Sequence, residues 1–353
     1  MTPFEHPDFD DHEEVAFFSD ERSGLHAIVA IHRTSALGGS GGGCRMHPYP
    51  SASRALTDAL RLSRAMSHKL ALMDVPAGGA KAVVIADPRH DKTEALLHAL
   101  GHAVDTLHGR FIVAEDAGTN PGDMAILGEE TPYVMRHAGD GAAATAEGVL
   151  LGMGEAVRHR LGAASLDGLR VGVQGVGRVG LALCRLLTRS GARVVASDLD
   201  GERLALAARE LGVQALGAEA LLEHELDVFA PCAMGEVLDD ATIPRLRCAV
   251  VAGSANEQLA EARHAAQLAS RGILFTPDFV LNAGGVLGAA TDVARGEPGA
   301  CSACARIPAL LHEIFERATE ERVTPYEVAL RMAREKCRRA SIRAARASPA
   351  ARA

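Results

Sequence analysis

The chain of 353 residues is long enough for two domains, because a single hydrophobic core rarely grows beyond about 250–300 residues. Hydrophobic residues make up 48% of it and charged residues 23%, which is typical of a folded globular protein. The net charge of −8 is spread along the chain and only 3% of the residues are aromatic. We therefore expect no nucleic-acid partner.

The sequence contains no signal for insertion into a membrane or for export. No apolar run reaches the roughly 18–20 residues that a membrane span requires. The acidic N-terminus, MTPFEHPDFDDHEEV, lacks the basic start and apolar stretch of a signal peptide. The 7 cysteines are odd in number and scattered, which favours reduced thiols over a disulfide framework. We expect a cytoplasmic protein with no membrane partner.

The first third of the chain mixes short apolar runs with glycine-rich segments. Residues 26–32 (HAIVAIH) predict a strand, and a glycine-rich loop is expected to follow at 38–43. Apolar residues at helical spacing predict a helix over 51–67, with Lys69 just past its end.

A second glycine-rich loop, at 78–79, is expected to precede Lys81 and a strand over 82–86. Asp91 is expected to open a helix that runs to about 107, with Glu94 as its capping-box partner. FIVAE (111–115) then predicts a buried strand, and Asp116 lies at its C-terminal end.

From residue 169 onward, short apolar runs alternate with helical patterns. Such alternation predicts parallel strands joined by right-handed helical crossovers, and hence a doubly wound α/β sheet. The expected strands are 169–174, 193–198, 227–232, 248–253 and 273–277.

The boundary between the two expected domains falls near 138–146, where the residues are small and the chain is expected to be flexible. We expect a first α/β domain over 1–140 and a second domain over 141–320. The helical segment at about 320–353 is expected to pack back on the first domain, and its end to fray beyond about 342.

A glycine fingerprint follows the first strand of the second domain. Gly175, Gly177 and Gly180 form G-x-G-x-x-G between a predicted strand and a predicted helix. This arrangement places the pyrophosphate of a dinucleotide at a helix N-terminus. Asp198, 23 residues beyond Gly175 at the end of the next strand, is expected to accept hydrogen bonds from the adenosine ribose, which favours NAD over NADP. The alternative is a glycine-rich turn in an unrelated α/β protein.

Two lysines stand out in the first domain because the chain contains only four: Lys69, Lys81, Lys92 and Lys336. Lys69 and Lys81 lie beside glycine-rich segments within an apolar stretch. A lysine desolvated in a cleft can serve as a general base, and a nearby carboxylate such as Asp116 can exchange protons with it. The alternative is that both are ordinary surface lysines.

Several stretches together resemble the amino-acid dehydrogenases, and more narrowly the leucine, phenylalanine and valine dehydrogenase branch of the glutamate dehydrogenase superfamily. The resemblance runs in order from about residue 25 to about 335. Its most specific part is M-S-x-K followed twelve residues later by G-G-A-K. The stretches are GGGCRM, DALRLSRAMSHK, AGGAK, AEDAGT, TAEGV, VQGVGRVG, APCAMG, AGSANEQL and DFVLNAGGV.

The resemblance implies a fold and an activity. It implies an N-terminal α/β domain for substrate binding and oligomerisation, followed by a Rossmann-type NAD-binding domain, with a cleft between them. The reaction would be the reversible, NAD-dependent oxidative deamination of an apolar L-amino acid to its 2-oxo acid and ammonia. The protein would be a homo-oligomer, a dimer or an octamer.

The resemblance also assigns roles to residues. Lys69, with the backbone of Gly42 and Gly43, would bind the substrate carboxylate, Lys81 would activate the attacking water, and Asp116 would shuttle protons to and from the substrate nitrogen. In the cofactor domain, Thr145, Asn256 and Asn282 would line the nicotinamide end, and Val176, Cys232 and Ala233 would lie in the cofactor region.

The substrate pocket would be lined by Gly41, Ala114, Val286 and Ala289. Gly41 and Ala289 are smaller than the residues common in leucine-type enzymes, which favours a leucine-like or larger side chain. An aromatic amino-acid dehydrogenase of secondary metabolism is one alternative. A catalytically inactive NAD- or amino-acid-binding protein is another.

Two weaker patterns carry little weight. Cys301 and Cys304 form a single C-x-x-C without a second pair, and His98 and His102 share a helix face without the H-E-x-x-H pattern of zinc enzymes. We therefore expect no metal site.

Overall fold

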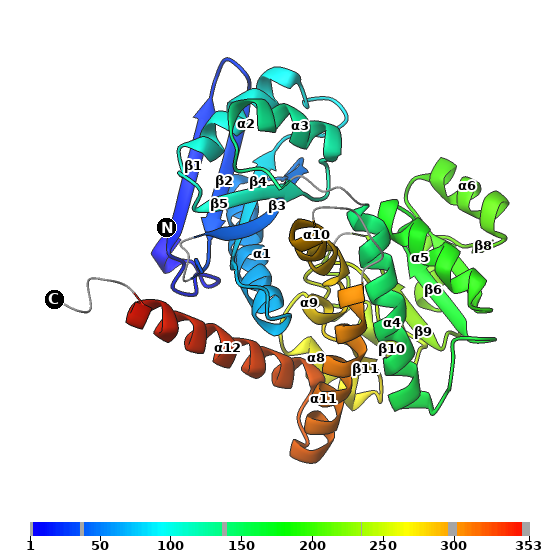
Figure 1. Cartoon of the computed structure of the whole chain (residues 1–353). Coiled ribbons are helices and arrows are strands. Elements are labelled where there is room, and N and C mark those ends of the chain that lie inside the picture. Colours follow the sequence, from blue (N-terminus) through cyan, green and yellow to red (C-terminus); the bar gives the residue numbers. More distant parts are fainter. Residues whose placement is uncertain (1–2, 36–38, 136–139, 234, 296–301, 348–353) are drawn as a thin grey trace. The chain divides into compact units, whose positions relative to one another are not determined.

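The computed structural model describes residues 3–35, 39–135, 140–233, 235–295 and 302–347. The chain divides into two compact units, the first comprising Met1–His137 and Ala333–Ala353 and the second Ala138–Met332 (Figure 1). Both are α/β units, as expected. Among the described residues, no helix is long and apolar enough to cross a membrane.

The first unit is built on a five-stranded mixed sheet with the strand order β1-β2-β4-β3-β5. β2 pairs antiparallel with both β1 and β4, whereas β3 runs parallel to its neighbours β4 and β5. Its strands are β1 (Glu14–Asp20), β2 (Leu25–Ile31), β3 (Ser40–His47), β4 (Gly78–Ile85) and β5 (Phe111–Glu115).

Helices cover both faces of this sheet. On one face, α2 (Glu94–Asp105) and α3 (Pro121–Glu130) pack through Leu100 and Leu127 against alternate residues of the strands. On the other face, α1 (Ala52–Leu72) packs through Ala59 and Leu60 against Ile28 and Val83 (Figure 1). The residues of α1 and of this second face position the candidate site.

The predicted glycine loop at 78–79 is wrong, and the one at 38–43 is wrong from Ser40 onward, because these residues lie in strands; residue 38 lies outside the described residues and Gly39 precedes the strand. Gly41, Gly42 and Gly43 lie within β3, and Gly78 and Gly79 begin β4. A Cβ atom built on Gly42 would lie 1.7 Å from the carbonyl oxygen of Ala80, and one on Gly79 would lie 2.1 Å from the backbone nitrogen of Ser67. Glycine is used here because neighbouring backbone approaches the strands closely.

Two helix boundaries also differ from the prediction. α1 continues to Leu72, so Lys69 lies in its last turn rather than past its end. α2 begins at Glu94, and its N-cap is Thr93, whose hydroxyl accepts a hydrogen bond from the backbone nitrogen of Leu96. The Asp91 carboxylate instead accepts a hydrogen bond from the backbone nitrogen of Asp87, which closes a turn before the helix.

The second unit is the predicted doubly wound parallel sheet. Its six strands run in the order β11-β10-β9-β6-β7-β8, so the strand order reverses at β6. They are β6 (Arg170–Gln174), β7 (Arg193–Ser197), β8 (Gln214–Ala215), β9 (Val228–Pro231), β10 (Val250–Val251) and β11 (Leu274–Phe275).

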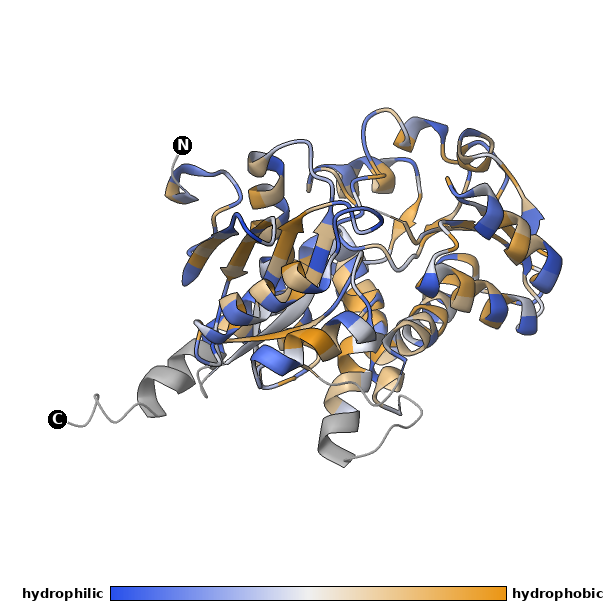
Figure 2. Cartoon of the chain, turned by 90° about the horizontal axis from the view of Figure 1, so that it is seen from above, coloured by the Kyte–Doolittle hydropathy of each residue, from blue (hydrophilic) through white to orange (hydrophobic). Residues whose placement is uncertain are grey.

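Helices surround this sheet. In Figure 2 orange, hydrophobic residues run along the strands, whereas several of the outer helices mix blue and orange residues. The helices are α4 (Gly141–Leu161), α5 (Arg178–Arg189), α6 (Gly201–Leu211), α7 (Ala218–Leu222), α8 (His264–Ser270), α9 (Asp278–Leu281), α10 (Gly284–Arg295) and α11 (Arg306–Glu321). A further helix, α12 (Pro325–Ala347), begins in the second unit and continues into the segment assigned to the first.

Helical structure extends further than expected at both places predicted to be flexible. α4 already begins at Gly141, because the Asp140 carboxylate caps it by accepting a hydrogen bond from the backbone nitrogen of Ala142. α12 continues to Ala347, past the expected point of fraying at 342.

Candidate active site

A buried ion pair forms the centre of the candidate site in the first unit. Lys81 projects from β4, where neighbouring strands bury it to 3% exposure, and its Nζ lies 2.6 Å from Oδ2 of Asp116. Asp116 follows the last residue of β5, and its backbone nitrogen donates a hydrogen bond to the hydroxyl of Thr119. An amine and a carboxylate at this distance can pass a proton directly between them.

The glycines of β3 make room for this pair. A Cβ on Gly43 would lie 2.7 Å from the Cβ of Asp116 and 3.2 Å from the Nζ of Lys81. Any larger residue at this position would displace the ion pair, so the backbone itself forms one wall of the site.

Lys69 lies in the same unit, on the last turn of α1, and is 6% exposed. This end of α1 presses against the start of β4, because Gly79 allows the backbone of Ser67 to approach closely. β4 carries Lys81 two residues further on, so Lys69 is held on the helix that covers the face of the ion pair.

The prediction missed Arg45, a buried cation on β3. Its Nε lies 3.3 Å from Oδ2 of Asp116, and its Nη1 lies 2.9 Å from Oδ2 of Asp58 on α1. The hydroxyl of Tyr49 donates a hydrogen bond to the same Asp58 oxygen. An arginine two residues after Gly43 on a buried strand is a signal that could have revealed it, because buried arginines require carboxylate partners.

The charges around Asp116 control its ionisation. Burial raises the pKa of its carboxyl, but the adjacent Lys81 and Arg45 cations outweigh burial and hold the pKa well below its usual range. The pKa of the Arg45 guanidinium is raised in turn, because Asp116 and Asp58 outweigh the burial that would lower it. The carboxylate is therefore ionised while both cations are charged.

The glycine fingerprint of the second unit has the geometry of an anion site. Gly175 has φ +96, a conformation that favours glycine, and a Cβ on Gly180 would lie 1.9 Å from the carbonyl oxygen of Gly175. Helix α5 therefore begins directly against the turn, and Gly177 is its N-cap with no side-chain cap. A Cβ on Gly177 would meet no atom within 4 Å, so this side of the turn is open.

Asp198 follows β7 and holds this turn in place. Its Oδ2 accepts a hydrogen bond of 2.7 Å from the backbone nitrogen of Val176, and its Oδ1 accepts one of 2.8 Å from that of Asp200. Each carboxylate oxygen can accept a second hydrogen bond. The remaining acceptor capacity of the Asp198 carboxylate thus fits the ribose hydroxyls of a dinucleotide, which would donate hydrogen bonds to it.

Cys232 and Ala233 lie opposite the turn. The backbone nitrogen of Cys232 donates a hydrogen bond of 2.7 Å to Gln174, and a Cβ on Gly175 would lie 2.9 Å from the Cβ of Ala233. Burial raises the pKa of the Cys232 thiol, which keeps it protonated and a poor nucleophile.

A second group of polar residues gathers in the same unit. The amide nitrogen of Asn282 donates hydrogen bonds to Oδ1 of Asn256, at 2.8 Å, and to the carbonyl oxygen of Ser254, at 3.1 Å. Oδ1 of Asn282 is buried without a hydrogen-bond partner, and such an atom calls for a bound donor. Thr145 on α4 lies against α10, since a Cβ on Gly285 would be 2.7 Å from its hydroxyl oxygen.

The four predicted pocket residues are divided between the units. In the first unit, Gly41 lies on β3, where an added Cβ would meet no atom within 4 Å, and Ala114 lies on β5 and is half-buried. In the second unit, Val286 and Ala289 lie on the first turns of α10, and Ala289 is buried.

The two weaker sequence patterns are the pair His98 and His102 and the pair Cys301 and Cys304. His98 and His102 both contact the carboxylate of Glu130, at 2.7 and 3.1 Å. Cys301 lies outside the described residues. Among the residues that the structure does describe, no group of three or more His, Cys, Asp or Glu side chains could hold a metal ion.

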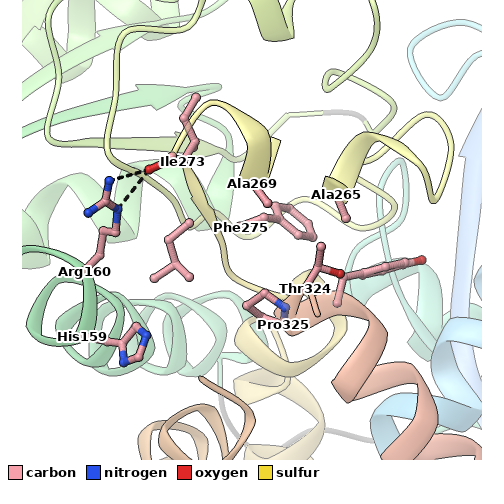
Figure 3. A pocket seen from close by; sticks show the side chains of 11 residues that line it. His159, Arg160, Ala265, Ala269, Ile273, Phe275, Thr324 and Pro325 are labelled. Carbon is pink, nitrogen blue, oxygen red and sulfur yellow. Dashed lines mark hydrogen bonds between the residues drawn. The ribbon is translucent and has the colours of Figure 1, made fainter. Parts of the chain in front are cut away.

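The second unit also has a pocket of about 360 Å³ that contains none of the predicted residues (Figure 3). Phe275 and Pro325 line it, and the guanidinium of Arg160 is held at its edge by two hydrogen bonds to the carbonyl oxygen of Gly272. Because that guanidinium is already occupied, we assign the pocket no role.

Two family models match the chain. Residues 12–133 match the model described as Glu/Leu/Phe/Val dehydrogenase, dimerisation domain, and residues 202–348 match the model described as Glutamate/Leucine/Phenylalanine/Valine dehydrogenase. Together the matches include Lys69, Lys81 and Asp116 of the first unit.

Similar proteins cover nearly the whole chain. A leucine dehydrogenase from Geobacillus stearothermophilus is 41% identical over 95% of this chain and 93% of its own length, and a phenylalanine dehydrogenase from Thermoactinomyces intermedius is 39% identical over 95% and 94%. The crystal structure of an L-tryptophan dehydrogenase from Nostoc punctiforme is 39% identical, has a TM-score of 0.74, and is matched over 94% of this chain and 97% of that one.

Proposed function

The chain belongs to the glutamate/leucine/phenylalanine/valine dehydrogenase family of amino-acid dehydrogenases, and from this premise we propose that it oxidises a large apolar L-amino acid with NAD. The products are the 2-oxo acid and ammonia, and the reaction is reversible. The observation that carries the proposal is the buried contact of 2.6 Å between Lys81 and Asp116 beside the glycine backbone of β3.

Lys81 and Asp116 perform the proton transfers in this proposal. Asp116 takes a proton from the substrate ammonium group, so that the nitrogen lone pair can form the imine as the α-hydrogen leaves. Lys81, when deprotonated, removes a proton from the water that adds to the imine carbon, and Asp116 returns a proton to the departing nitrogen. Because the two side chains are in direct contact, a proton that one of them takes up in one step can pass to the other for the next step.

Lys69 binds the α-carboxylate of the substrate. A charge-assisted hydrogen bond from a buried lysine is stronger than one in water, and the buried position on α1 keeps the amine from reaching solvent freely. The backbone of Gly42 and Gly43 in β3 lies against the site and completes this contact.

A bound NAD would supply the acceptor for the hydride that leaves the α-carbon. The turn at Gly175, Gly177 and Gly180 and the N-terminus of α5 hold its pyrophosphate, with Val176, Cys232 and Ala233 around the turn. The Asp198 carboxylate accepts hydrogen bonds from the adenosine ribose and repels a 2′-phosphate, which favours NAD over NADP. Thr145, Asn256 and Asn282 hold the nicotinamide end, where the unpartnered Asn282 oxygen accepts a hydrogen bond.

We infer that the small residues Gly41 and Ala114 of the first unit, and Val286 and Ala289 of the second, each leave room for a leucine-like or larger substrate side chain. The open space at Gly41 supports this size. A specialised enzyme for phenylalanine or tryptophan is the second candidate, supported by relatives of both names at 39–40% identity.

We also propose that the chain works as a homo-oligomer, a dimer or an octamer. β1 is an edge strand of the first unit, and the side chain of Phe17 on it is 59% exposed. An apolar residue on an unpaired strand edge favours pairing with a second copy. Sedimentation of the purified chain tests this, since a monomer at micromolar concentration would contradict it.

Spectrophotometry of NAD reduction at alkaline pH, over a panel of L-amino acids, tests the proposed activity. Oxidation of apolar amino acids is the expected result. Binding of NAD without reduction by any amino acid would favour the inactive binding protein, although the intact Lys81–Asp116 pair argues against it. NADP rates equal to those with NAD would contradict the role of Asp198.

A further inference from the structure

Arg45 is a buried cation to which the reaction steps above assign no role. Its side chain is 7% exposed and bridges Asp116 and Asp58 with two different nitrogens of one guanidinium. A guanidinium carries its charge at every working pH, and its planar fork fixes the positions of both partners. Burying it is favourable only because two carboxylates compensate its charge.

Oδ2 of Asp116 is shared between two cations of different character. Lys81 can lose its proton during the reaction, whereas Arg45 cannot. When Lys81 is neutral, Arg45 is therefore the cation that still stabilises the Asp116 carboxylate. Asp58, hydrogen-bonded by Tyr49, offsets part of the Arg45 charge and so limits how strongly Arg45 stabilises it.

We propose that Arg45 is a positioning residue that holds the Asp116 carboxylate beside Lys81 and, balanced by Asp58, sets the pH at which the Lys81–Asp116 pair takes up a proton. The inference rests on the proposed function and adds two residues, Arg45 and Asp58, to its machinery.

Other titratable groups near Asp116 include a thiol, an ion pair and the adjacent Glu115. Burial raises the pKa of the Cys44 thiol to about 12, so it carries no charge at neutral pH. Lys92 and Asp123 pair with each other at 2.8 Å. The groups around the Asp116 carboxylate are thus Lys81 from β4, Cys44 and Arg45 from β3, Asp58 from α1, Glu115 from β5, and the Lys92–Asp123 pair.

Two substitutions are expected to move the pH profile in opposite directions. Arg45→Met removes a positive charge beside the Lys81–Asp116 pair, which then keeps its proton to higher pH, so the acidic limb of kcat/KM for amino-acid oxidation shifts to higher pH by about 1–3 units. Asp58→Asn removes a negative charge and lets Tyr49 keep its acceptor, so the limb shifts to lower pH. Structural damage alone would lower activity without shifting the limb in opposite directions.

Two further variants are matched controls. Arg45→Lys keeps the charge but cannot bridge both carboxylates, so its limb should shift less than that of Arg45→Met. Arg89→Met removes an exposed arginine and should leave the limb at its wild-type position.

An unchanged limb in both Arg45→Met and Asp58→Asn, or a shift of both in the same direction, would overturn the inference while leaving the proposed function intact. A wild-type enzyme that oxidises no amino acid would instead overturn the proposed function. If Arg45→Met does not fold, the downward shift expected of Asp58→Asn decides the question alone.

Discussion

Lys81 and Asp116 are the two residues whose removal most affects the proposed chemistry. Lys81→Met and Asp116→Asn remove one proton-transfer group each while keeping the side-chain volume, so kcat should fall by about 10²–10⁴-fold. NAD binding should be nearly unchanged, because the glycine fingerprint lies in the other unit. Steady-state kinetics and NAD titration by fluorescence measure the two effects.

Lys69→Met is the matched comparison for these variants. It removes a carboxylate contact rather than a proton-transfer group, so KM should rise more than kcat falls. Turnover in Lys81→Met within threefold of wild type would refute the assignment of the base.

At the scale of single elements, two glycines of the turn before α5 have different expected roles: Gly177 in binding NAD and Gly180 in packing. A Cβ fits at Gly177 without meeting any atom within 4 Å, whereas at Gly180 it would lie 1.9 Å from the carbonyl oxygen of Gly175. We therefore expect Gly177→Ala to keep the wild-type Tm but to weaken NAD binding at least tenfold, and Gly180→Ala to lower both Tm and affinity.

The control for this pair is Gly154→Ala, which lies on α4 and also has no atom within 4 Å of the added Cβ. Alanine favours the helix by up to about 1 kcal/mol, so Tm should be unchanged or higher and NAD affinity unaltered. Equal NAD affinity in Gly177→Ala and Gly154→Ala would contradict the proposed pyrophosphate site.

We expect two buried histidines, His12, which contacts α1, and His68 on α1, to make the first unit sensitive to acid. Burial lowers the pKa of His12 to about 4 and that of His68 to about 3, so both are neutral in the folded protein. Above pH 6.5 both histidines are neutral in the folded and in the unfolded chain. As the pH falls below 6.5, the histidines of the unfolded chain bind protons while those of the folded chain stay neutral, so unfolding becomes more favourable. Stability against urea should decrease from about pH 6.5 toward 4, by up to about 1.4 kcal/mol per pH unit for each histidine.

His12→Gln tests this most cleanly, since glutamine can donate to the Leu60 carbonyl oxygen that His12 contacts at 3.0 Å but cannot become charged. Its stability should fall less between pH 7.5 and 5 than that of wild type. His26→Gln, at an exposed position, should lose as much stability between pH 7.5 and 5 as the wild type does. The same loss in His12→Gln and wild type would show that His12 does not drive acid unfolding.

The success of sequence-based prediction varied between the elements of the two units. The doubly wound sheet was predictable because its longer strands have apolar, buried centres and the turn at Gly175 has a recognisable spacing. The strands at Gly41–Gly43 and Gly78–Gly79 were not, because isolated glycine runs resemble loops until the neighbouring backbone that requires them is known. Arg45 was missed since its partners Asp58 and Asp116 lie 13 and 71 residues away.

For the whole molecule, we expect the preferred substrate to depend on small residues that include Ala289 on α10. Ala289→Val adds two methyl groups on α10, so it should shift the preference toward smaller amino acids by about tenfold or more. The ratio of kcat/KM for phenylalanine to that for valine measures this shift. An unchanged ratio would mean that Ala289 does not line the pocket.

The decisive measurement is kcat/KM of the wild-type chain with NAD for L-valine, L-leucine, L-phenylalanine and L-glutamate. Leucine or phenylalanine should exceed valine by about 10-fold or more, and glutamate should be poorest, because its second carboxylate would be buried without a partner. Valine or glutamate as the best substrate would contradict the enlarged apolar pocket, and no NAD reduction with any of the four would contradict the dehydrogenase itself.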